Sequence, residues 1–150
     1  WPQAFLGLTF NWGALLGWAA VEGELTWPAG LLYAGGIAWT LGYDTIYAHQ
    51  DKEDDAMIGV KSSALALGDK TRPWLWVFYG LALTVFAAAG VLAKTSWPFY
   101  TGLTATALIF IWQSTRVKID NPANCLRMFK LNFWVGAIFF AGIVGARAIG

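Results

Sequence analysis

The sequence predicts an all-α membrane protein with five transmembrane helices. Of its 150 residues, 57% are hydrophobic and 13% are charged, whereas a soluble domain usually carries about a quarter charged residues. The apolar residues gather into five stretches, each long enough, or nearly so, to cross about 30 Å of hydrocarbon. The formal net charge of +1 gives no indication of a nucleic-acid partner. The single Cys125 rules out an intramolecular disulfide and a zinc site made of several thiolates.

The five expected helices form one transmembrane domain over residues 1–150. Proline is tolerated at the start of a helix, and Pro28, Pro73 and Pro98 each lie near the beginning of an apolar stretch. We also expect a short amphipathic helix from about 62 to 67. The expected transmembrane helices cover about 3–21, 28–48, 74–93, 98–115 and 131–148, and the long connections between them cover about 49–73 and 116–130.

Small and polar residues within the apolar stretches predict how these helices pack. Gly35, Gly36 and Gly42 leave room for neighbours to approach the second helix closely. Asn11 is expected to hydrogen-bond across helices, as polar groups in transmembrane helices often do. Gln3 lies near the cytoplasmic end of the first helix, where it is a candidate to line a cavity.

Loop charge predicts the orientation of the chain in the lipid bilayer. Cytoplasmic loops carry an excess of Lys and Arg. Alternating loops divide these residues unevenly, with Lys94 and Arg147 on one side and eight on the other: Lys52, Lys61, Lys70, Arg72, Arg116, Lys118, Arg127 and Lys130. We therefore expect both long connections to face the cytoplasm in a bacterial inner membrane, with the matrix side of a mitochondrial inner membrane as the alternative. Arg127 and Lys130 are interpreted as solvated loop charges of this kind.

Acidic residues follow the second expected helix directly. Because acidic residues at the end of a membrane helix are costly, they usually have a function. If this helix continues to about residue 55, Asp44, Asp51 and Asp55 share one face, since steps of seven and eleven residues return to within about 20° of the starting direction. Asp51 and Asp55 then lie at i and i+4, where like charges repel unless a cation lies between them. Mg²⁺ takes one or two carboxylates and completes its shell with water and phosphate oxygens.

The residues around this pair suit the same chemistry. Asp54 is a candidate outer group of a metal site, and Lys61 brings a positive charge that a phosphate would attract. Asp44 lies deeper, at membrane depth, one turn from Tyr47. On spacing alone, the alternative remains open that the acidic residues are a solvated cluster at the end of a membrane helix.

The segment from Tyr43 to Ser62 resembles the second aspartate-rich motif of the UbiA superfamily of intramembrane prenyltransferases. It reads Tyr43-Asp44-Thr45-Ile46-Tyr47-Ala48-x-x-Asp51-Lys52-x-Asp54-Asp55-x-x-Ile58-Gly59-Val60-Lys61-Ser62. The resemblance extends over nearly the whole chain and includes Trp1-Pro2-Gln3, Leu6-Gly7 and Asn11-Trp12-Gly13. It is closest to the branch that acts on 4-hydroxybenzoate in ubiquinone biosynthesis.

The resemblance implies a fold and a reaction. The family fold is a bundle of nine transmembrane helices around a cavity, in which two aspartate-rich motifs hold Mg²⁺ and the diphosphate of a polyprenyl donor. The donor ionises, and the aromatic acceptor, here 4-hydroxybenzoate, attacks the allylic cation. By position, Asp51 and Asp55 would be metal ligands, and Asp51 or Asp44 would be the candidate catalytic base. Lys61, Asp54 and Tyr47 would assist diphosphate binding.

The chain departs from the family pattern in one respect. It lacks the first motif, of the form N-D-x-x-D-x-x-x-D, so its five helices would be the last five of nine. Its opening on Trp1 without Met also favours a fragment, and we expect the isolated chain to be inactive without the N-terminal helices. Two alternatives remain from the residues themselves: a membrane transporter of cations or protons with an intramembrane carboxylate, and a structural membrane subunit.

Overall fold

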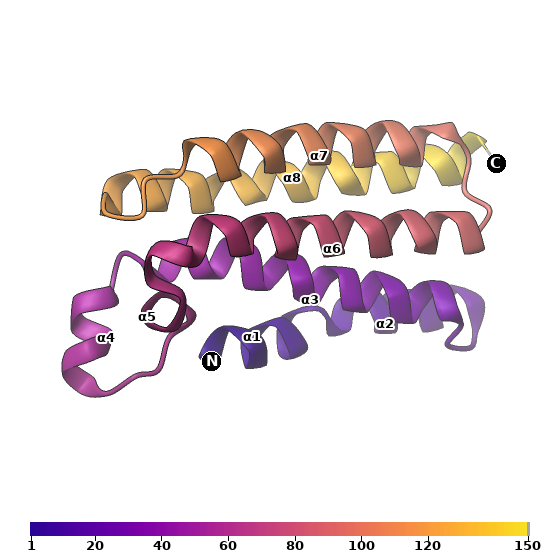
Figure 1. Cartoon of the computed structure of the whole chain (residues 1–150). Coiled ribbons are helices and arrows are strands. Elements are labelled where there is room, and N and C mark those ends of the chain that lie inside the picture. Colours follow the sequence, from indigo (N-terminus) through magenta and orange to yellow (C-terminus); the bar gives the residue numbers. More distant parts are fainter. Residues whose placement is uncertain (150) are drawn as a thin grey trace.

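A computed structural model describes residues 1–149, and these residues form helices joined by short turns, without a β-strand (Figure 1). Two short helices, α1 and α2, begin the chain. Four long helices follow, α3, α6, α7 and α8, and the short elements α4, α5 and η1 connect α3 to α6. The elements are α1 (Pro2–Phe10), α2 (Trp12–Glu22), α3 (Trp27–Ala48), α4 (Lys52–Ile58), α5 (Ser63–Leu67), the 3₁₀ turn η1 (Gly68–Lys70), α6 (Thr71–Leu92), α7 (Trp97–Arg116) and α8 (Pro122–Ile149).

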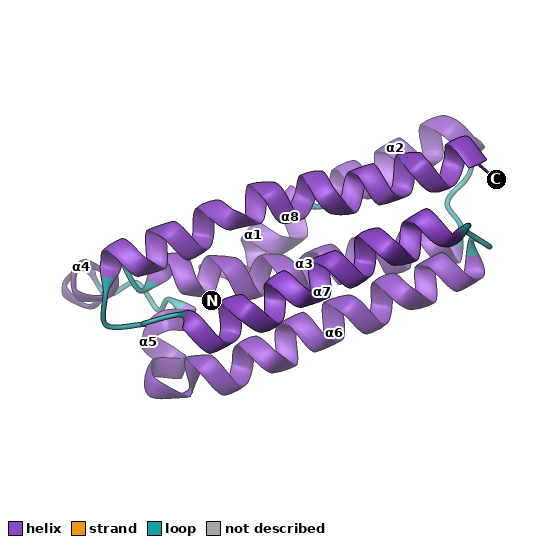
Figure 2. Ribbon diagram, turned by 90° about the horizontal axis from the view of Figure 1, so that it is seen from above, coloured by secondary structure: helices purple, strands orange, loops and turns teal. Residues whose placement is uncertain are grey.

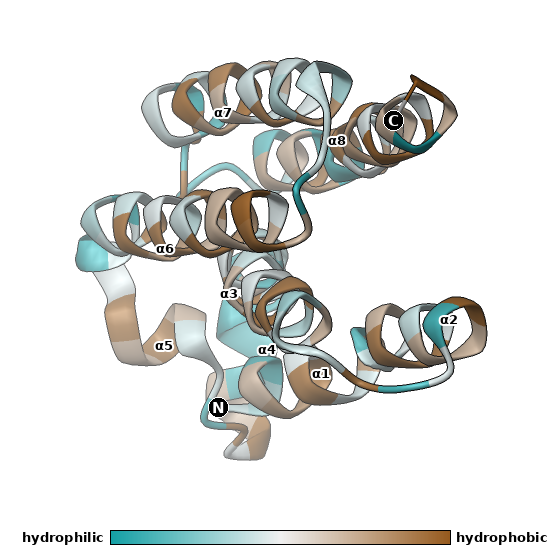
Figure 3. Cartoon of the chain, turned by 90° about the vertical axis from the view of Figure 1, so that its right-hand side faces the viewer, coloured by the Kyte–Doolittle hydropathy of each residue, from teal (hydrophilic) through white to brown (hydrophobic). Residues whose placement is uncertain are grey.

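The long helices lie side by side, and α3 is central among them. It packs against α1, α2, α6 and α8, while α7 packs between α6 and α8. Seen along the bundle, α7 and α8 form one pair, and α6 and α3 lie next to them, with α1 and α2 on the far side of α3 (Figure 3). Figure 2 shows the same long helices from above, with the connections between them at the two ends of the bundle.

The two long connections meet at one end of the bundle, as loop charge predicts. Figure 1 places α4, α5 and the α7–α8 turn at that end, and the α2–α3 and α6–α7 turns at the other. Both connections are more helical than expected. The first contains α4, α5 and η1, and its helix α5 agrees with the short helix expected from about 62 to 67. The second is largely absorbed by α8, which begins at Pro122 rather than near residue 131.

Three helical stretches are long and apolar enough to cross a membrane: Pro2–Glu22, Ser63–Leu92 and Pro122–Ile149. The described structure therefore does not confirm the count of five spans. Helices α3 and α7 are 22 and 20 residues long, but both are rich in residues of low hydropathy, including Trp, Tyr, Thr and Gly. Length alone would permit them to span about 30 Å of hydrocarbon.

The first expected helix, 3–21, is divided at Asn11. This residue ends α1 and begins α2 with φ −90° and ψ 3°. Its side-chain amide donates to the carbonyl of Gly7 at 2.7 Å and to the hydroxyl of Thr40 at 3.0 Å. The Asn11 amide therefore joins α1 to α3 across helices, as expected of a polar group in an apolar segment.

Glycines allow the close packing around α3. A Cβ at Gly42 would collide with the Tyr79 ring on α6, and one at Gly36 would collide with the Asn11 amide. The sequence-based expectation that neighbours approach these glycines closely is confirmed. Tyr79 also stacks on Phe110 at a ring-centroid distance of 4.1 Å and lies in the main buried cluster of the bundle.

Candidate functional site

The acidic segment does not continue α3. That helix ends at Ala48, and α4 is a separate helix that begins at Lys52, with Asp51 in the N-cap position. The end of α3 at Ala48 agrees with the expected range 28–48, and the condition that this helix continues to about residue 55 is not met, so Asp44, Asp51 and Asp55 do not share one helical face. Acidic side chains stabilise the positive end of a helix, so Glu53, Asp54 and Asp55 in the first turn of α4 favour a new helix start here.

Asp51 and Asp55 nevertheless remain one helical turn apart. The backbone N–H of Asp55 donates to the carbonyl of Asp51 at 2.8 Å. Although Asp is a favoured N-cap residue, the Asp51 side chain accepts no capping hydrogen bond. The Asp51 side chain is exposed, and the Asp55 side chain is half-buried. Both carboxylates are therefore free to take another partner.

Among the described residues, no lysine or arginine forms an ion pair with these carboxylates. In residues 1–149, the single ion pair joins Arg147 and Glu22 at 3.6 Å, at the opposite end of the bundle. The same residues contain no group of three or more His, Cys, Asp or Glu side chains placed to hold a metal. Mg²⁺ needs only one or two carboxylates when water and phosphate complete its shell. The Asp51–Asp55 pair fits that requirement as part of a shared site.

The other predicted site residues are distributed over α3, α4 and the connection from α4 to α5. Asp44 is half-buried on α3, and no hydrogen bond joins it to Tyr47 among the described contacts. Tyr47 instead packs on Phe129 of α8 at a centroid distance of 4.6 Å. Asp54 is exposed and lines a pocket of about 520 Å³. Lys61 is exposed between α4 and α5.

Both ends of the acidic segment are fixed to the bundle. At its start, the buried His49 ring bonds through Nε2 to the Thr71 hydroxyl at 2.9 Å. Burial lowers the pKa of His49, the neighbouring Lys52 ammonium lowers it further, and the Asp120 and Asp69 carboxylates oppose this change. His49 is thus held in its neutral form at pH 7.

At its end, a buried chain of polar contacts holds the start of α5. The backbone N–H of Ser63 donates to the side-chain carbonyl of Gln3 at 2.9 Å, and the Ser63 hydroxyl bonds to Thr45 at 2.8 Å. Ser62 caps α5 by accepting from the N–H of Leu65. Gln3, which the sequence suggests as a candidate to line a cavity, is buried and bonds to the start of α5, two residues after Lys61.

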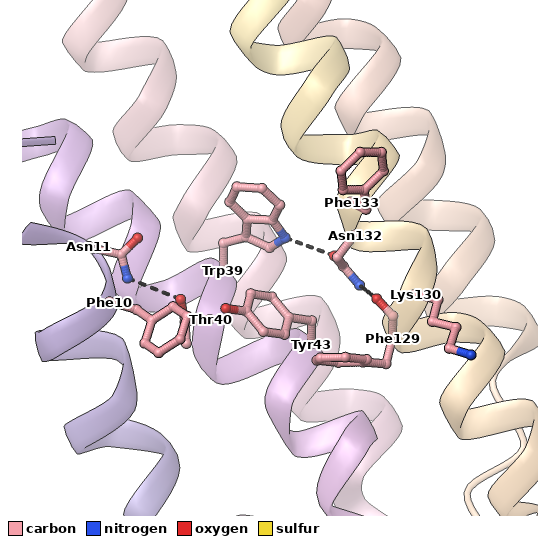
Figure 4. Close-up of a pocket in the computed structure, with 9 residues that line it drawn as sticks. All are labelled: Phe10, Asn11, Trp39, Thr40, Tyr43, Phe129, Lys130, Asn132 and Phe133. Atoms are coloured by element: carbon pink, nitrogen blue, oxygen red, sulfur yellow. Dashed lines mark hydrogen bonds between the residues drawn. The ribbon is translucent and has the colours of Figure 1, made fainter. Parts of the chain in front are cut away.

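A pocket of about 400 Å³ lies between α1, α3 and α8, beside the acidic end of α3 (Figure 4). Its walls are largely aromatic, and the Trp39 indole N–H crosses to the Asn132 carbonyl at 2.8 Å. The sequence interpretation did not select Thr40, Tyr43 or Asn132. Polar side chains within apolar helices were the available signal, since such groups seldom face lipid. The lining residues are Phe10, Asn11, Trp39, Thr40, Tyr43, Phe129, Lys130, Asn132 and Phe133.

The fold and the site define an integral membrane protein with a helical bundle and unpaired carboxylates at one membrane end. Residues 1–143 match the family described as the UbiA prenyltransferase family. The chain belongs to this family, and the resemblance found in the segment Tyr43 to Ser62 is confirmed.

Several curated relatives carry the name 4-hydroxybenzoate polyprenyltransferase, mitochondrial. The chain is 52% identical to the one from Caenorhabditis elegans over 150 residues, which are 99% of this chain and 42% of the relative. It is 50% identical to the one from Arabidopsis thaliana over 99% of this chain and 37% of the relative. For the human relative, the identity is 47% over 96% of this chain and 39% of the relative. The chain thus spans about two fifths of these relatives. No solved structure matches it.

Proposed function

We propose that the protein containing this chain transfers a prenyl group from a polyprenyl diphosphate to an aromatic acid, 4-hydroxybenzoate, in ubiquinone biosynthesis. The names of relatives at 43–52% identity support this reaction. The observation that carries the site is the pair Asp51 and Asp55, one turn apart and without a cationic partner in residues 1–149. Nothing in the comparisons favours the transporter alternative.

Asp51 and Asp55 would hold Mg²⁺ against the diphosphate. A bound magnesium ion supplies charge neutralisation to the leaving diphosphate as its bond to the prenyl carbon breaks. The Asp51 carboxylate, which caps no backbone group, would be a ligand and remains a candidate base for the ring proton. Asp54, on the same turn, would contribute through bound water.

Residues outside α4 would bind and orient the substrates. Lys61 would contact the diphosphate, because it is exposed and lies on the short connection from α4 to α5. Tyr47 would contact the diphosphate from α3. The Tyr47 ring is held in place by its packing on Phe129. Asp44, half-buried and adjacent to the pocket residue Tyr43, would orient the polar group of the acceptor.

The site formed by this chain is half of a complete one. We propose that a first aspartate-rich motif on upstream helices provides the second set of carboxylates, and that the described helices form five of nine spans around a shared cavity. The isolated chain would then bind the diphosphate weakly and would not turn over. The relatives are named mitochondrial, which favours a mitochondrial inner membrane over the bacterial one, with α4 on the matrix side.

The test replaces the carboxylates in the full-length protein. Asp51→Asn and Asp55→Asn remove metal-ligand charge with little change in size. We expect each to reduce prenyl transfer from a polyprenyl diphosphate to 4-hydroxybenzoate in isolated membranes by at least about 100-fold, typical of a lost electrostatic contact to a leaving group. Glu53→Gln, on the same turn of α4, is the matched control and should retain activity. Full activity of both Asp variants would rule out the metal role.

A further inference from the structure

A groove runs along one side of α8 near its first turns. It has a volume of about 390 Å³, and no residue of α4 lines it. All of its lining residues come from α8: Ala123, Leu126, Arg127, Lys130, Leu131 and Trp134. Arg127 and Lys130 give the groove two cations, and its other lining residues are apolar.

The two cations of this groove have no acidic partner. The sequence of α8 contains no Asp or Glu. Arg127 and Lys130 are exposed, and neither takes part in the one ion pair that residues 1–149 contain. Positions three apart on a helix are neighbours on its surface. Arg127 and Lys130 together therefore form a concentrated positive patch that attracts a single anionic group.

The position of the patch along α8 corresponds to the surface of the membrane. The segment 131–146 is free of charge, and at 1.5 Å per residue it rises about 24 Å, close to the thickness of a hydrocarbon core. Arg147 lies at its far end, paired with Glu22. Lys130 and Arg127 are then at the level of the lipid headgroups on the opposite side. Trp134 is 61% exposed one turn deeper, where aromatic residues anchor membrane proteins.

We propose that this groove binds one anionic phospholipid. The lipid phosphate lies between Arg127 and Lys130, and the first carbons of its acyl chains lie against Leu131 and Trp134. Basic pockets at the cytoplasmic or matrix face of transmembrane helices bind anionic lipid headgroups in this way. A free anion would use the cations but not the apolar residues of the groove. The two cations together with the apolar residues therefore favour a lipid over a free anion.

The test measures lipid binding by the full-length protein in neutral detergent. Native mass spectrometry would compare retention of phosphatidylglycerol with retention of phosphatidylcholine. We expect the double variant Arg127→Gln and Lys130→Gln to bind phosphatidylglycerol about 25-fold more weakly, or about fivefold for each charge. Phosphatidylcholine retention should not change. The double variant Arg127→Lys and Lys130→Arg, which keeps both charges, should retain phosphatidylglycerol and shows that the site tolerates substitution.

The matched control removes two cations from the same end of the bundle. Arg116→Gln with Lys118→Gln affects exposed residues at the end of α7 and in the turn that follows. This pair should leave phosphatidylglycerol binding unchanged. An equal loss in the control would show that overall charge attracts the lipid and would overturn the proposal. Displacement of the lipid by millimolar inorganic phosphate would also overturn it, since the site would then bind a free anion.

Discussion

Gln3 and Ser63 join the start of the chain to the end of the acidic segment. The side-chain carbonyl of Gln3 accepts the backbone N–H of Ser63 at 2.9 Å, and both residues are buried. A buried N–H without a partner is costly, so this contact fixes where α5 begins. Because Lys61 lies just before α5, the position of Lys61 depends on a residue of the first helix.

We predict that Gln3→Met destabilises the full-length protein by about 1–3 kcal/mol, because it leaves the Ser63 N–H unsatisfied at nearly unchanged volume. Thermal unfolding in detergent would measure this change. Gln50→Met is the control, since the Gln50 amide makes only a 3.4 Å contact with the Tyr47 carbonyl. Equal unfolding temperatures for the Gln3 variant and the wild-type protein would contradict the role of this contact.

The packing of α3 on α6 gives a second prediction. Gly42→Ala places a methyl group against the buried Tyr79 ring, and such overpacking typically costs about 1–3 kcal/mol. Gly80→Ala is the matched control, because a Cβ at Gly80 meets nothing within 4 Å and alanine favours a helix by roughly 0.5–1 kcal/mol. The two variants should therefore move the unfolding temperature in opposite directions. A shift of the same sign in both would show that the α3–α6 contact is looser than described.

The proposed role of Lys61 gives a prediction about binding of the donor diphosphate. Lys61→Gln should raise the KM for the polyprenyl diphosphate about tenfold, since a charge-assisted hydrogen bond is lost, with a smaller effect on the KM for the acceptor. Steady-state kinetics in membranes would separate the two constants. Lys70→Gln, another exposed lysine of the same connection, should leave both unchanged. If the two lysine variants behave alike, Lys61 contributes only to the general charge of the loop.

The sequence predicts the helices better than their ends. Apolar stretches with a proline at the start identify α3 and α7 within a few residues. The sequence predicts the start of α8 too late, near residue 131, because Arg127 and Lys130 resemble loop residues. Its true start has a local signal: the Asn121 side chain accepts the N–H of Asn124 at 2.9 Å, immediately around Pro122.

Some features of the candidate site depend on neighbouring residues and can be predicted from the sequence, whereas others depend on contacts between distant residues. The spacing of Asp51 and Asp55 is local, so the sequence places them one turn apart even though α3 does not continue to residue 55. The end of α3 is set partly by His49, whose ring bonds to Thr71, 22 positions away. The break at Asn11 likewise involves Thr40 on another helix. Contacts of this kind depend on the assembled bundle and cannot be read from neighbouring residues.

The two anchors of the acidic segment have a consequence for engineering. Residues 50–61 lie between His49, bonded to Thr71, and the Ser62–Ser63 cap bonded to Gln3 and Thr45. The twelve positions 50–61 can therefore be exchanged as a cassette with those of another family member, provided that the anchors match. Such chimeras would exchange the proposed metal-binding and diphosphate-binding residues between family members while leaving the long helices of the bundle unchanged.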